Sequence, residues 1–514
     1  MNTFLLTDLV SPDANLSIIA PELVVAAAGV IVMIVDSFLP GRRSLTGAIS
    51  LAGLLLAGVM LVSVWSTGPA MAWNGMIVHD GLRVGFSLVF IFVSLMTVLI
   101  STIWVEREHV PAGEYHALLL FATFGMMMMS AGNDLVVIFL GLETLSIATY
   151  VMAGLRKADL RSNESAMKYF ILGSFASAFL LYGMALVYGA TGSTAIHVIA
   201  DRVATPNFPA LLLVGGAMMI IGFGFKVALA PFHVWTPDVY EGAPTPITGF
   251  MAAGPKAAAL AAFIRIFVLG FPLASAGYQA AGYLHEAWIS SLSVLAIITI
   301  IVGNTAAIMQ SNVKRMLAFS SIAHAGYATV GFIGAGLAKT PSGRDEAIAS
   351  VAFYMLTYAV TNMGAFAIVT LLAEKNDRRT EFEDYNGIGF KSPILSFSLS
   401  LFMLSLLGLP LTAGFIGKVL VFRPAIEAGN RLATALVVVA VVGSAVSAYY
   451  YLRLIVVMFF RERLTDWRAP AVPAALAAVL VITVAGVLYL GLFSDGLIQR
   501  FAGARSAAVA FVEK

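Results

Sequence analysis

Long runs of apolar residues, separated by short polar loops, follow one another along almost the whole chain. About 20 apolar residues are enough for an α-helix to cross the hydrocarbon core of a bilayer. On this criterion the pattern predicts fourteen transmembrane helices, at residues 16–38, 44–66, 82–104, 114–131, 134–154, 164–191, 208–240, 245–270, 285–308, 312–335, 345–373, 392–422, 430–460 and 469–494. The predicted fold class is therefore an all-α polytopic membrane protein.

Two of these helices are unusually long and contain breaks. The seventh is interrupted by ALAPFHVWTPD and the twelfth by LGLPLTAGFIGK. Paired breaks of this kind in separated helices indicate an inverted-repeat transporter. Irregular backbone at membrane depth survives only where protein or trapped water satisfies its polar groups, so the breaks also predict a hydrated interior.

The breaks suggest a division of the chain into four parts. Residues 1–108 would hold helices 1 to 3, and residues 109–272 would form a first repeat of helices 4 to 8. Residues 273–465 would form the inverted second repeat, helices 9 to 13, and residues 466–514 would hold helix 14 and the C-terminal tail.

Composition narrows the function classes. Hydrophobic residues make up 60% of the chain and charged residues only 11%, whereas charged residues approach a quarter of a soluble protein. The chain has no cysteine, which excludes thiolate-ligated iron-sulfur clusters and thiol catalysis within it, so any redox chemistry would belong to a partner. The net charge of +2 and the lack of a long basic block give no indication of nucleic acid as a partner.

Basic residues divide unequally between the two faces of the predicted membrane domain. If the helices alternate in direction, the loops on one face hold fifteen Lys and Arg residues, and the opposite face with the C-terminal tail holds nine. The positive-inside rule then places both termini on the periplasmic side of a bacterial plasma membrane. No Lys or Arg precedes Arg42, so the N-terminus lacks the basic region of a secretory signal and is interpreted as a retained first span.

Four ionisable side chains are predicted near the middle of the membrane. Glu143 and Lys256 lie nine and eleven residues into helices 5 and 8, which at 1.5 Å per residue is roughly 14 and 16 Å from the surface, and His324 lies at a similar depth in helix 10. Lys226 precedes the break in helix 7. A charge at this depth costs roughly 2.5 to 3.5 kcal/mol, so each group requires a partner or a function.

Two further lysines are predicted away from the centre. Lys418 follows the break in helix 12 and should lie in the outer half of the membrane. Lys168 begins helix 6 on the cytoplasmic side, four residues after Glu164, in the favourable order for an ion pair. Asp238 and Glu241 are predicted at the cytoplasmic mouth, as helix caps or surface charges.

Structural roles compete with proton transfer for these groups. A single histidine such as His324 often hydrogen-bonds a neighbouring helix, and His233 could satisfy carbonyl groups freed at the break. Glu143 could neutralise Lys226 as a structural pair. The structural interpretation is weakest for the deep lysines together, because three lysines against one glutamate leave charge without a partner. Lysines in such surroundings can take up and release protons, and both histidines are further candidates for proton transfer.

Several segments carry a family resemblance. The run KVALAPFHVWTPDVYEGAPTPITGFMAAGPKAA resembles the most characteristic segment of the proton-pumping antiporter-like subunits of NADH-quinone oxidoreductase, respiratory complex I. FLGLETLSIATYVMAGL, ESAMKYFILGSFASA, SNVKRMLAFSSIAHAGY and GLPLTAGFIGK resemble other parts of the same subunits, so the resemblance extends from helix 4 to helix 13. It implies fourteen helices with these inverted repeats, and proton translocation driven by NADH oxidation and quinone reduction in other subunits.

The resemblance also implies a role for each lysine. Glu143 would correspond to the key glutamate of the family and Lys226 to its helix 7 partner. Lys256 would be the central relay, Lys418 would lead to the outer exit, and Lys168 would lie near the pair. The family carries no cofactor in such a chain; FMN, iron-sulfur clusters and quinone are expected in partner subunits.

Other functions remain open at this stage. The expected partners are the sister antiporter-like subunits, small membrane subunits and the lipid bilayer. The same fold and motifs would also serve a multisubunit cation/proton antiporter, or a subunit of a ferredoxin- or hydrogenase-linked pump. A non-pumping structural subunit, in which the charges only hold the helices in register, is a further alternative.

Overall fold

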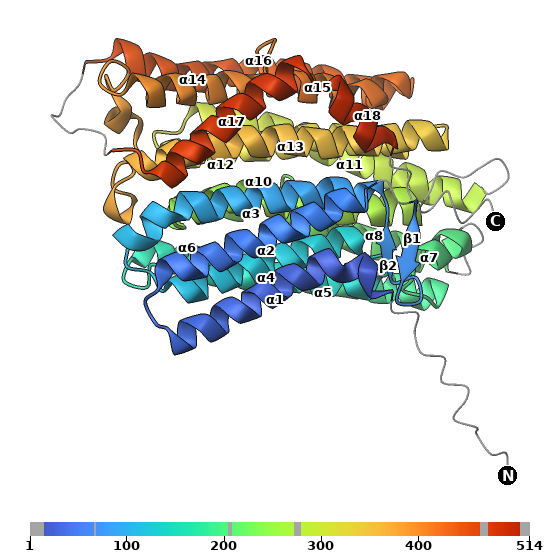
Figure 1. Ribbon diagram of the computed structural model, residues 1–514. Coiled ribbons are helices and arrows are strands. Elements are labelled where there is room, and N and C mark those ends of the chain that lie inside the picture. The colour runs from blue at the N-terminus through green and yellow to red at the C-terminus, as the bar shows by residue number, and fades with distance from the viewer. Residues whose placement is uncertain (1–14, 66–67, 204–207, 272–278, 463–470, 504–514) are drawn as a thin grey trace.

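The computed structural model describes residues 15–65, 68–203, 208–271, 279–462 and 471–503. Most of these residues belong to helices that run side by side (Figure 1). The helices of the bundle are α1 (Leu16–Phe38), α2 (Arg43–Ser63), α3 (Gly81–Arg107), α4 (Ala112–Ala131), α5 (Leu135–Ala153), α6 (Leu160–Thr191), α8 (Pro209–Val227), α9 (Trp235–Gly242), α10 (Thr245–Ile264), α11 (Gln279–Ile308), α12 (Val313–Gly336), α13 (Pro341–Leu372), α14 (Pro393–Leu407), α15 (Ala413–Glu427), α16 (Arg431–Phe460) and α17 (Ala474–Leu492).

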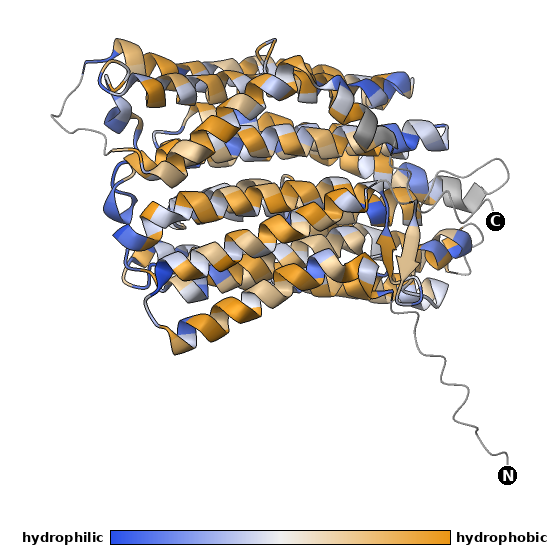
Figure 2. Ribbon diagram, viewed as in Figure 1, coloured by the Kyte–Doolittle hydropathy of each residue, from blue (hydrophilic) through white to orange (hydrophobic). Residues whose placement is uncertain are grey.

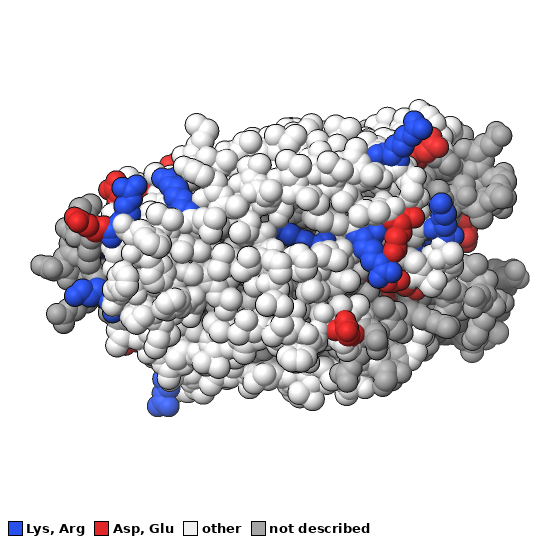
Figure 3. All heavy atoms as spheres, turned by 90° about the horizontal axis from the view of Figure 1, so that it is seen from above, with Lys and Arg blue, Asp and Glu red and all other residues white. Residues whose placement is uncertain are grey.

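This arrangement confirms the predicted fold class. Twelve of the described helices are long and apolar enough to cross a membrane. The two remaining predicted crossings correspond to α4 and to the pair α14 and α15, whose halves are too short to cross alone. Figure 2 shows apolar residues along the bundle and hydrophilic residues gathered at its two ends. In Figure 3 the charged side chains on one face also lie mainly toward the ends.

Both predicted breaks are present. The seventh predicted helix consists of α8 and α9, and the twelfth consists of α14 and α15. Each first half ends at a residue in the left-handed conformation, Ala228 with φ 68° and Gly408 with φ 93°. After α8, the carbonyl of Phe225 accepts a hydrogen bond from the Trp235 indole at 3.0 Å. The protein itself therefore satisfies part of the backbone that the break frees.

The centre of the bundle consists of α10, α12 and α13. The membrane-spanning windows of α10 and α12 are completely buried, and that of α13 is 94% buried. By contrast, only 28% of the corresponding windows of α2 and α16 are buried. A helix that is apolar and buried all round belongs in the interior of a large bundle, so ionisable groups on α10 and α12 lie where lipid and bulk water do not reach.

Several smaller elements complete the structure, and all of them except η2 lie outside the predicted crossings. They are β1 (Ala70–Ala72), which pairs antiparallel with β2 (Ile77–His79), the helices α7 (Ile196–Val203) and α18 (Asp495–Gly503), the π-helix η2 (Arg265–Leu269), and the 3₁₀ helices η3 (Lys375–Asp377) and η4 (Phe382–Tyr385). The π-helix η2 continues α10, and the two 3₁₀ helices lie in the polar loop between α13 and α14.

The second break is held together by close backbone packing at Gly414. A Cβ added there would overlap the carbonyl oxygen of Ser405, and the Gly414 amide donates to the Ser405 hydroxyl at 3.2 Å. We expect Gly414→Ala to push α15 away from α14 and to destabilise the chain by about 1–3 kcal/mol, the usual cost of overpacking. Thermal unfolding of the purified chain measures this cost.

Gly216→Ala is the matched control for this substitution. Gly216 lies within α8, and a Cβ added there would have no other atom within 4 Å. Equal unfolding temperatures for the two variants would show that close packing at the second break does not matter.

Candidate functional site

The first group of candidate residues lies between α5, α6 and α8. Glu143 is half-buried, and its carboxylate accepts a hydrogen bond from the Ser177 hydroxyl at 2.5 Å. Lys226 is only 4% exposed; its ammonium donates to the Tyr150 hydroxyl at 3.2 Å and lies 5.4 Å from the centre of the Tyr169 ring. The surroundings of this lysine are therefore one hydroxyl group and aromatic rings.

The direct ion pair expected between Glu143 and Lys226 is not formed. No contact within 4 Å joins their charged atoms in the part of the chain that the structure describes. Tyr150 follows Glu143 by two helical turns on α5, and its hydroxyl accepts the hydrogen bond of the Lys226 ammonium instead. A structural pair of Glu143 and Lys226 would therefore act over a longer distance than a direct ion pair.

Lys256 lies in the completely buried part of α10. Its ammonium donates to the Ser321 hydroxyl of α12 at 2.7 Å and lies 5.6 Å from the centre of the Tyr240 ring. Ser321 in turn donates to the carbonyl of Ala318. Lys256 has no ion pair with a carboxylate among the described residues. Its polar contact is thus a neutral hydroxyl.

His324 connects three helices through both of its ring nitrogens. Nδ1 lies 2.7 Å from the Tyr354 hydroxyl of α13, and Nε2 lies 3.2 Å from the Tyr451 hydroxyl of α16. Tyr451 also shares a hydrogen bond of 2.5 Å with Ser320. A neutral imidazole donates through one nitrogen and accepts through the other, which suits two hydroxyl partners. On α12 itself, Tyr327 packs edge-on against the His324 ring.

Lys418 of α15 binds the C-terminal end of α14, the first half of the second broken helix. Its ammonium donates to the carbonyl groups of Leu406 and Leu407 at 2.9 and 2.8 Å, and to the Ser444 hydroxyl at 2.7 Å. These carbonyl groups belong to the last turn of α14, where no helical partner remains for them. A cation is also favoured at a helix C-terminus by the helix dipole.

Lys168 lies apart from these buried groups. Its ammonium pairs with Glu164 at 2.6 Å and with Asp238 at 2.9 Å, and its side chain is 41% exposed. Asp238 and Glu241 also pair with Arg315, at 2.8 and 2.7 Å. The predicted ion pair with Glu164 is confirmed, and Asp238 and Glu241 form the expected group of surface charges.

His233 does not satisfy the carbonyl groups at the first break. Its Nδ1 has no hydrogen-bond partner among the residues described, whereas Trp235 and the Leu229 amide bind the carbonyl groups that end α8. An indole and a backbone amide thus make these contacts, just after the left-handed residue Ala228.

Comparison with known proteins adds to this geometry. The family model described as "NADH:quinone oxidoreductase/Mrp antiporter, TM" matches residues 132–447. The chain belongs to the NADH:quinone oxidoreductase/Mrp antiporter family. The matched segment contains every candidate residue of the site, from Glu143 to Lys418.

Relatives within this family agree in length and in fold. NADH-quinone oxidoreductase subunit N of Trichlorobacter lovleyi is 43% identical over 490 residues, which cover 94% of this chain and 96% of the relative. A chain of respiratory complex I from Thermus thermophilus is 35% identical, with a TM-score of 0.78 over 94% of this chain and all of that one. Relatives from Solibacter usitatus and Chloroflexus aggregans, 41% and 38% identical, are also named NADH-quinone oxidoreductase subunit N, and this agrees with the resemblance of the WTPDVYEGAPTP segment to that subunit.

A chain of the Mrp complex from Dietzia sp. shows the same fold. It has a TM-score of 0.79 and is 19% identical, covering 95% of this chain and 96% of its own length. At this identity the likeness concerns the fold alone. The same architecture is therefore found in chains of more than one kind of complex.

The loops predicted on one face meet at one end of the bundle. In the loop between α13 and α14, Asp377 is buried and contacts Lys314 at 3.0 Å and Arg156 at 3.1 Å. Burial raises the pKa of Asp377, but the two cations together hold it below its ordinary value. The stabilisation from this ionised carboxylate is therefore present at neutral pH and is lost only as the pH falls below about 4.

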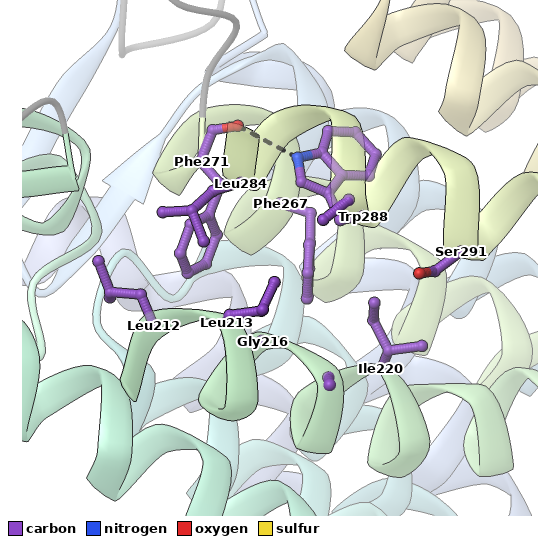
Figure 4. Close-up of a pocket in the computed structure, with 11 residues that line it drawn as sticks. Leu212, Leu213, Gly216, Ile220, Phe267, Phe271, Leu284, Trp288 and Ser291 are labelled. Atoms are coloured by element: carbon purple, nitrogen blue, oxygen red, sulfur yellow. Dashed lines mark hydrogen bonds between the residues drawn. The ribbon is translucent and has the colours of Figure 1, made fainter. Parts of the chain in front are cut away.

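A small apolar pocket between α8, η2 and α11 is separate from the candidate groups. Leu212, Ile220, Phe267 and Trp288 contribute to its lining, and Figure 4 shows the Trp288 indole donating to the Phe271 carbonyl at 3.4 Å. None of the lining residues is ionisable. This pocket offers no group for proton transfer.

Sequence reasoning missed the hydroxyl partners of the candidate residues. They are Tyr150, Ser177, Tyr354, Ser444 and Tyr451. Each of these residues lies on a different helix from the candidate residue that it contacts, so spacing along the chain does not predict the contact. The Asn304 amide joins the Tyr327 and Tyr450 hydroxyls at 3.0 Å each, between His324 and Lys418.

Proposed function

We propose that this chain is a proton-translocating membrane subunit of an NADH:quinone oxidoreductase. One observation carries the proposal: three buried lysines, Lys226, Lys256 and Lys418, have hydroxyl or carbonyl partners and no carboxylate ion pair within the described segments. A permanently charged lysine in such surroundings is costly, whereas one that exchanges a proton is charged only part of the time. The hydroxyl partners can both donate and accept protons.

The proposed path runs between the two breaks. Glu143 and Lys226 receive the proton beside the first break, and Lys256 carries it through the centre of the bundle on α10. His324 passes it through Tyr354 and Tyr451, and Lys418 releases it beside the second break. Lys168 stays outside this sequence as a group that feeds it, because its ion pairs are with Glu164 and Asp238. His233 stays a further candidate, since it interacts electrostatically with Lys256.

The redox reaction belongs to other subunits in this proposal. Among the residues described, no group of three or more His, Cys, Asp or Glu side chains is arranged to hold a metal ion. FMN, iron-sulfur clusters and quinone would be held by partners, and the neighbours in the bilayer would be other membrane-arm subunits. The proposed location is a bacterial plasma membrane with both termini on the periplasmic side.

Glu143 is the group through which a neighbour would act. Leu140 and Ile147, one turn before and after it on α5, are each 59% exposed on the outside of the bundle. A neighbouring subunit that covers this face would lie within reach of the carboxylate. A change in the charge beside Glu143 would then alter the proton affinity of Lys226 through a medium of low dielectric constant.

A multisubunit cation/proton antiporter is the second candidate function, favoured by the shared fold. Deleting the chain from its host distinguishes the two. For an oxidoreductase subunit, we expect NADH-dependent quinone reduction coupled to proton uptake to fall in isolated membranes, and the intact gene to restore it. Sodium sensitivity with normal NADH oxidation would instead support the antiporter.

A further inference from the structure

A large basic cavity opens at the end of the bundle that carries most of the loop cations. It encloses about 850 Å³ and is lined by three loops, residues 108–111, 155–161 and 375–378. These loops precede α4, join α5 to α6, and follow α13, so they come from both halves of the chain. We call this cavity the loop pocket. It is separate from the buried lysines of the proposed path.

The lining of the loop pocket has an excess of positive charge. Five of its residues are Lys or Arg, and two are carboxylates. Both carboxylates are already engaged, since Asp159 caps α6 and pairs with Arg156, and Glu108 accepts the Asn376 amide at 2.8 Å. The positive charge that remains has no counterpart in the lining.

Three of the five cations are available to a ligand. Lys157, Lys375 and Arg378 are exposed and form no ion pair among the residues that the structure describes. The fourth, Arg161, reaches Asp159 only at 3.7 Å with its side chain 61% exposed. An anion entering the loop pocket would therefore meet cations that do not first have to leave a partner.

The fifth cation, Arg156, is a buried residue in the lining of the loop pocket. The Arg156 side chain is only 5% exposed, and it is held by Asp377 at 3.1 Å and by the Gly242 carbonyl at 3.0 Å. Its Nε has no hydrogen-bond partner within the described ranges. A buried guanidinium with an unused N–H needs an acceptor, and an anionic oxygen provides one.

Apolar residues also contribute to the lining, beside the polar His109 and Asn376, and they decide between two kinds of anion. Val110, Pro111, Leu155 and Leu160 contribute to it, and Leu160 is 84% exposed at the start of α6. These residues lie where the apolar helices end, which is the level of lipid headgroups. Apolar and basic side chains together suit an amphiphile better than a small soluble ion.

We propose that the loop pocket binds the phosphate-bearing headgroup of an anionic membrane lipid. Basic pockets at helix ends are suited to such headgroups. The phosphate oxygens lie among Lys157, Lys375 and Arg378 above the Arg156 guanidinium, and the acyl chains leave along the apolar residues. Because the three loops belong to both halves of the chain, a bound headgroup joins them at this face.

Native mass spectrometry of the full-length chain, titrated with phosphatidylglycerol, tests the proposal. We compare the triple variant Lys157→Gln, Lys375→Gln and Arg378→Gln with a control triple variant of exposed loop cations at the same end, Arg42→Gln, Lys391→Gln and Arg461→Gln. Each variant removes the same charge, and thermal unfolding checks that both remain folded. Phosphatidylcholine and inorganic phosphate serve as competing ligands.

The expected result is that the loop-pocket variant loses affinity for phosphatidylglycerol by at least about tenfold, since each basic residue near a membrane surface contributes to anionic lipid binding. The control variant and the unchanged chain should retain the lipid, and phosphatidylcholine should not displace it. Equal retention by both variants, or equal loss from both, overturns the assignment to this pocket. Displacement by an equal concentration of inorganic phosphate overturns the assignment to a lipid.

Discussion

Replacing Lys256 with methionine is expected to slow proton transfer through this chain by roughly 10²- to 10⁴-fold, the range over which a positioned acid or base accelerates such a transfer. Methionine fills a similar volume but holds no proton. The lost hydrogen bond is the one to Ser321, whose hydroxyl keeps its own bond to the Ala318 carbonyl. The variant should therefore assemble, and NADH-driven proton uptake should fall relative to quinone reduction.

The matched control is Lys391→Met. Lys391 is an exposed lysine in the loop before α14 and is not part of the proposed path. The two variants change the same side chain in the same way and differ only in location. If Lys256→Met pumps as many protons per electron as Lys391→Met does, Lys256 is not a relay.

Removing the carboxylate of Glu22 is expected to destabilise the chain by about 3–5 kcal/mol, the usual cost of leaving one partner of a buried ion pair alone. Arg83 of α3 donates to Glu22 of α1 at 2.6 and 3.0 Å, and neither side chain is exposed. In Glu22→Ala the guanidinium would stay buried, with the Ile18 carbonyl as its remaining acceptor. Thermal unfolding of the purified chain, together with its yield in membranes, measures the loss.

The double variant Glu22→Leu and Arg83→Met is the control for this effect. It removes both charges and keeps apolar volume between α1 and α3, and such replacements are often neutral or stabilising. The double variant should therefore be more stable than Glu22→Ala alone. The opposite order of stability would mean that the pair contributes its own net attraction and that the buried charge is not the source of the cost.

The helices and their breaks could be predicted because their causes are local. Twenty apolar residues in succession predict a crossing wherever they occur, and the prolines that follow Ala228 and Gly408 disfavour a continuous helix there. Proline alone does not decide a break, since Pro255 lies inside α10. The positions of Lys226 before one break and Lys418 after the other also follow from the sequence. The contacts of Lys418 do not follow from the sequence. Its carbonyl partners at the end of α14 come within reach only when α14 and α15 pack together.

The ion pairs of the structure show the limit of sequence reasoning more clearly. Arg83 begins the third predicted helix and is counted among the cations of the outer face, yet it is completely buried against Glu22. Arg265 lies in a predicted crossing and is bound by Asp80 through two hydrogen bonds, at 3.0 and 2.9 Å. These partners are separated by 61 and 185 residues along the chain, so only the packing of the helices brings them together.

The same limit applies to the candidate site. Depth along each helix predicts that Glu143, Lys226, Lys256 and His324 lie within the membrane, and these residues are indeed in the bundle. The depth of a residue in the membrane does not, however, predict the direction in which its side chain points. The carboxylate of Glu143 turns to Ser177 rather than to Lys226, because rotation about the helix axis is set by neighbouring helices.

The central claim is that protons pass through Lys226. It is tested by NADH-driven proton uptake into inverted membrane vesicles that carry Lys226→Ala, normalised to assembled enzyme and to quinone reduced. We predict fewer protons per electron with normal assembly, because the alanine cannot hold a proton beside the first break. An unchanged number of protons per electron would contradict this and would leave Lys226 with a structural role.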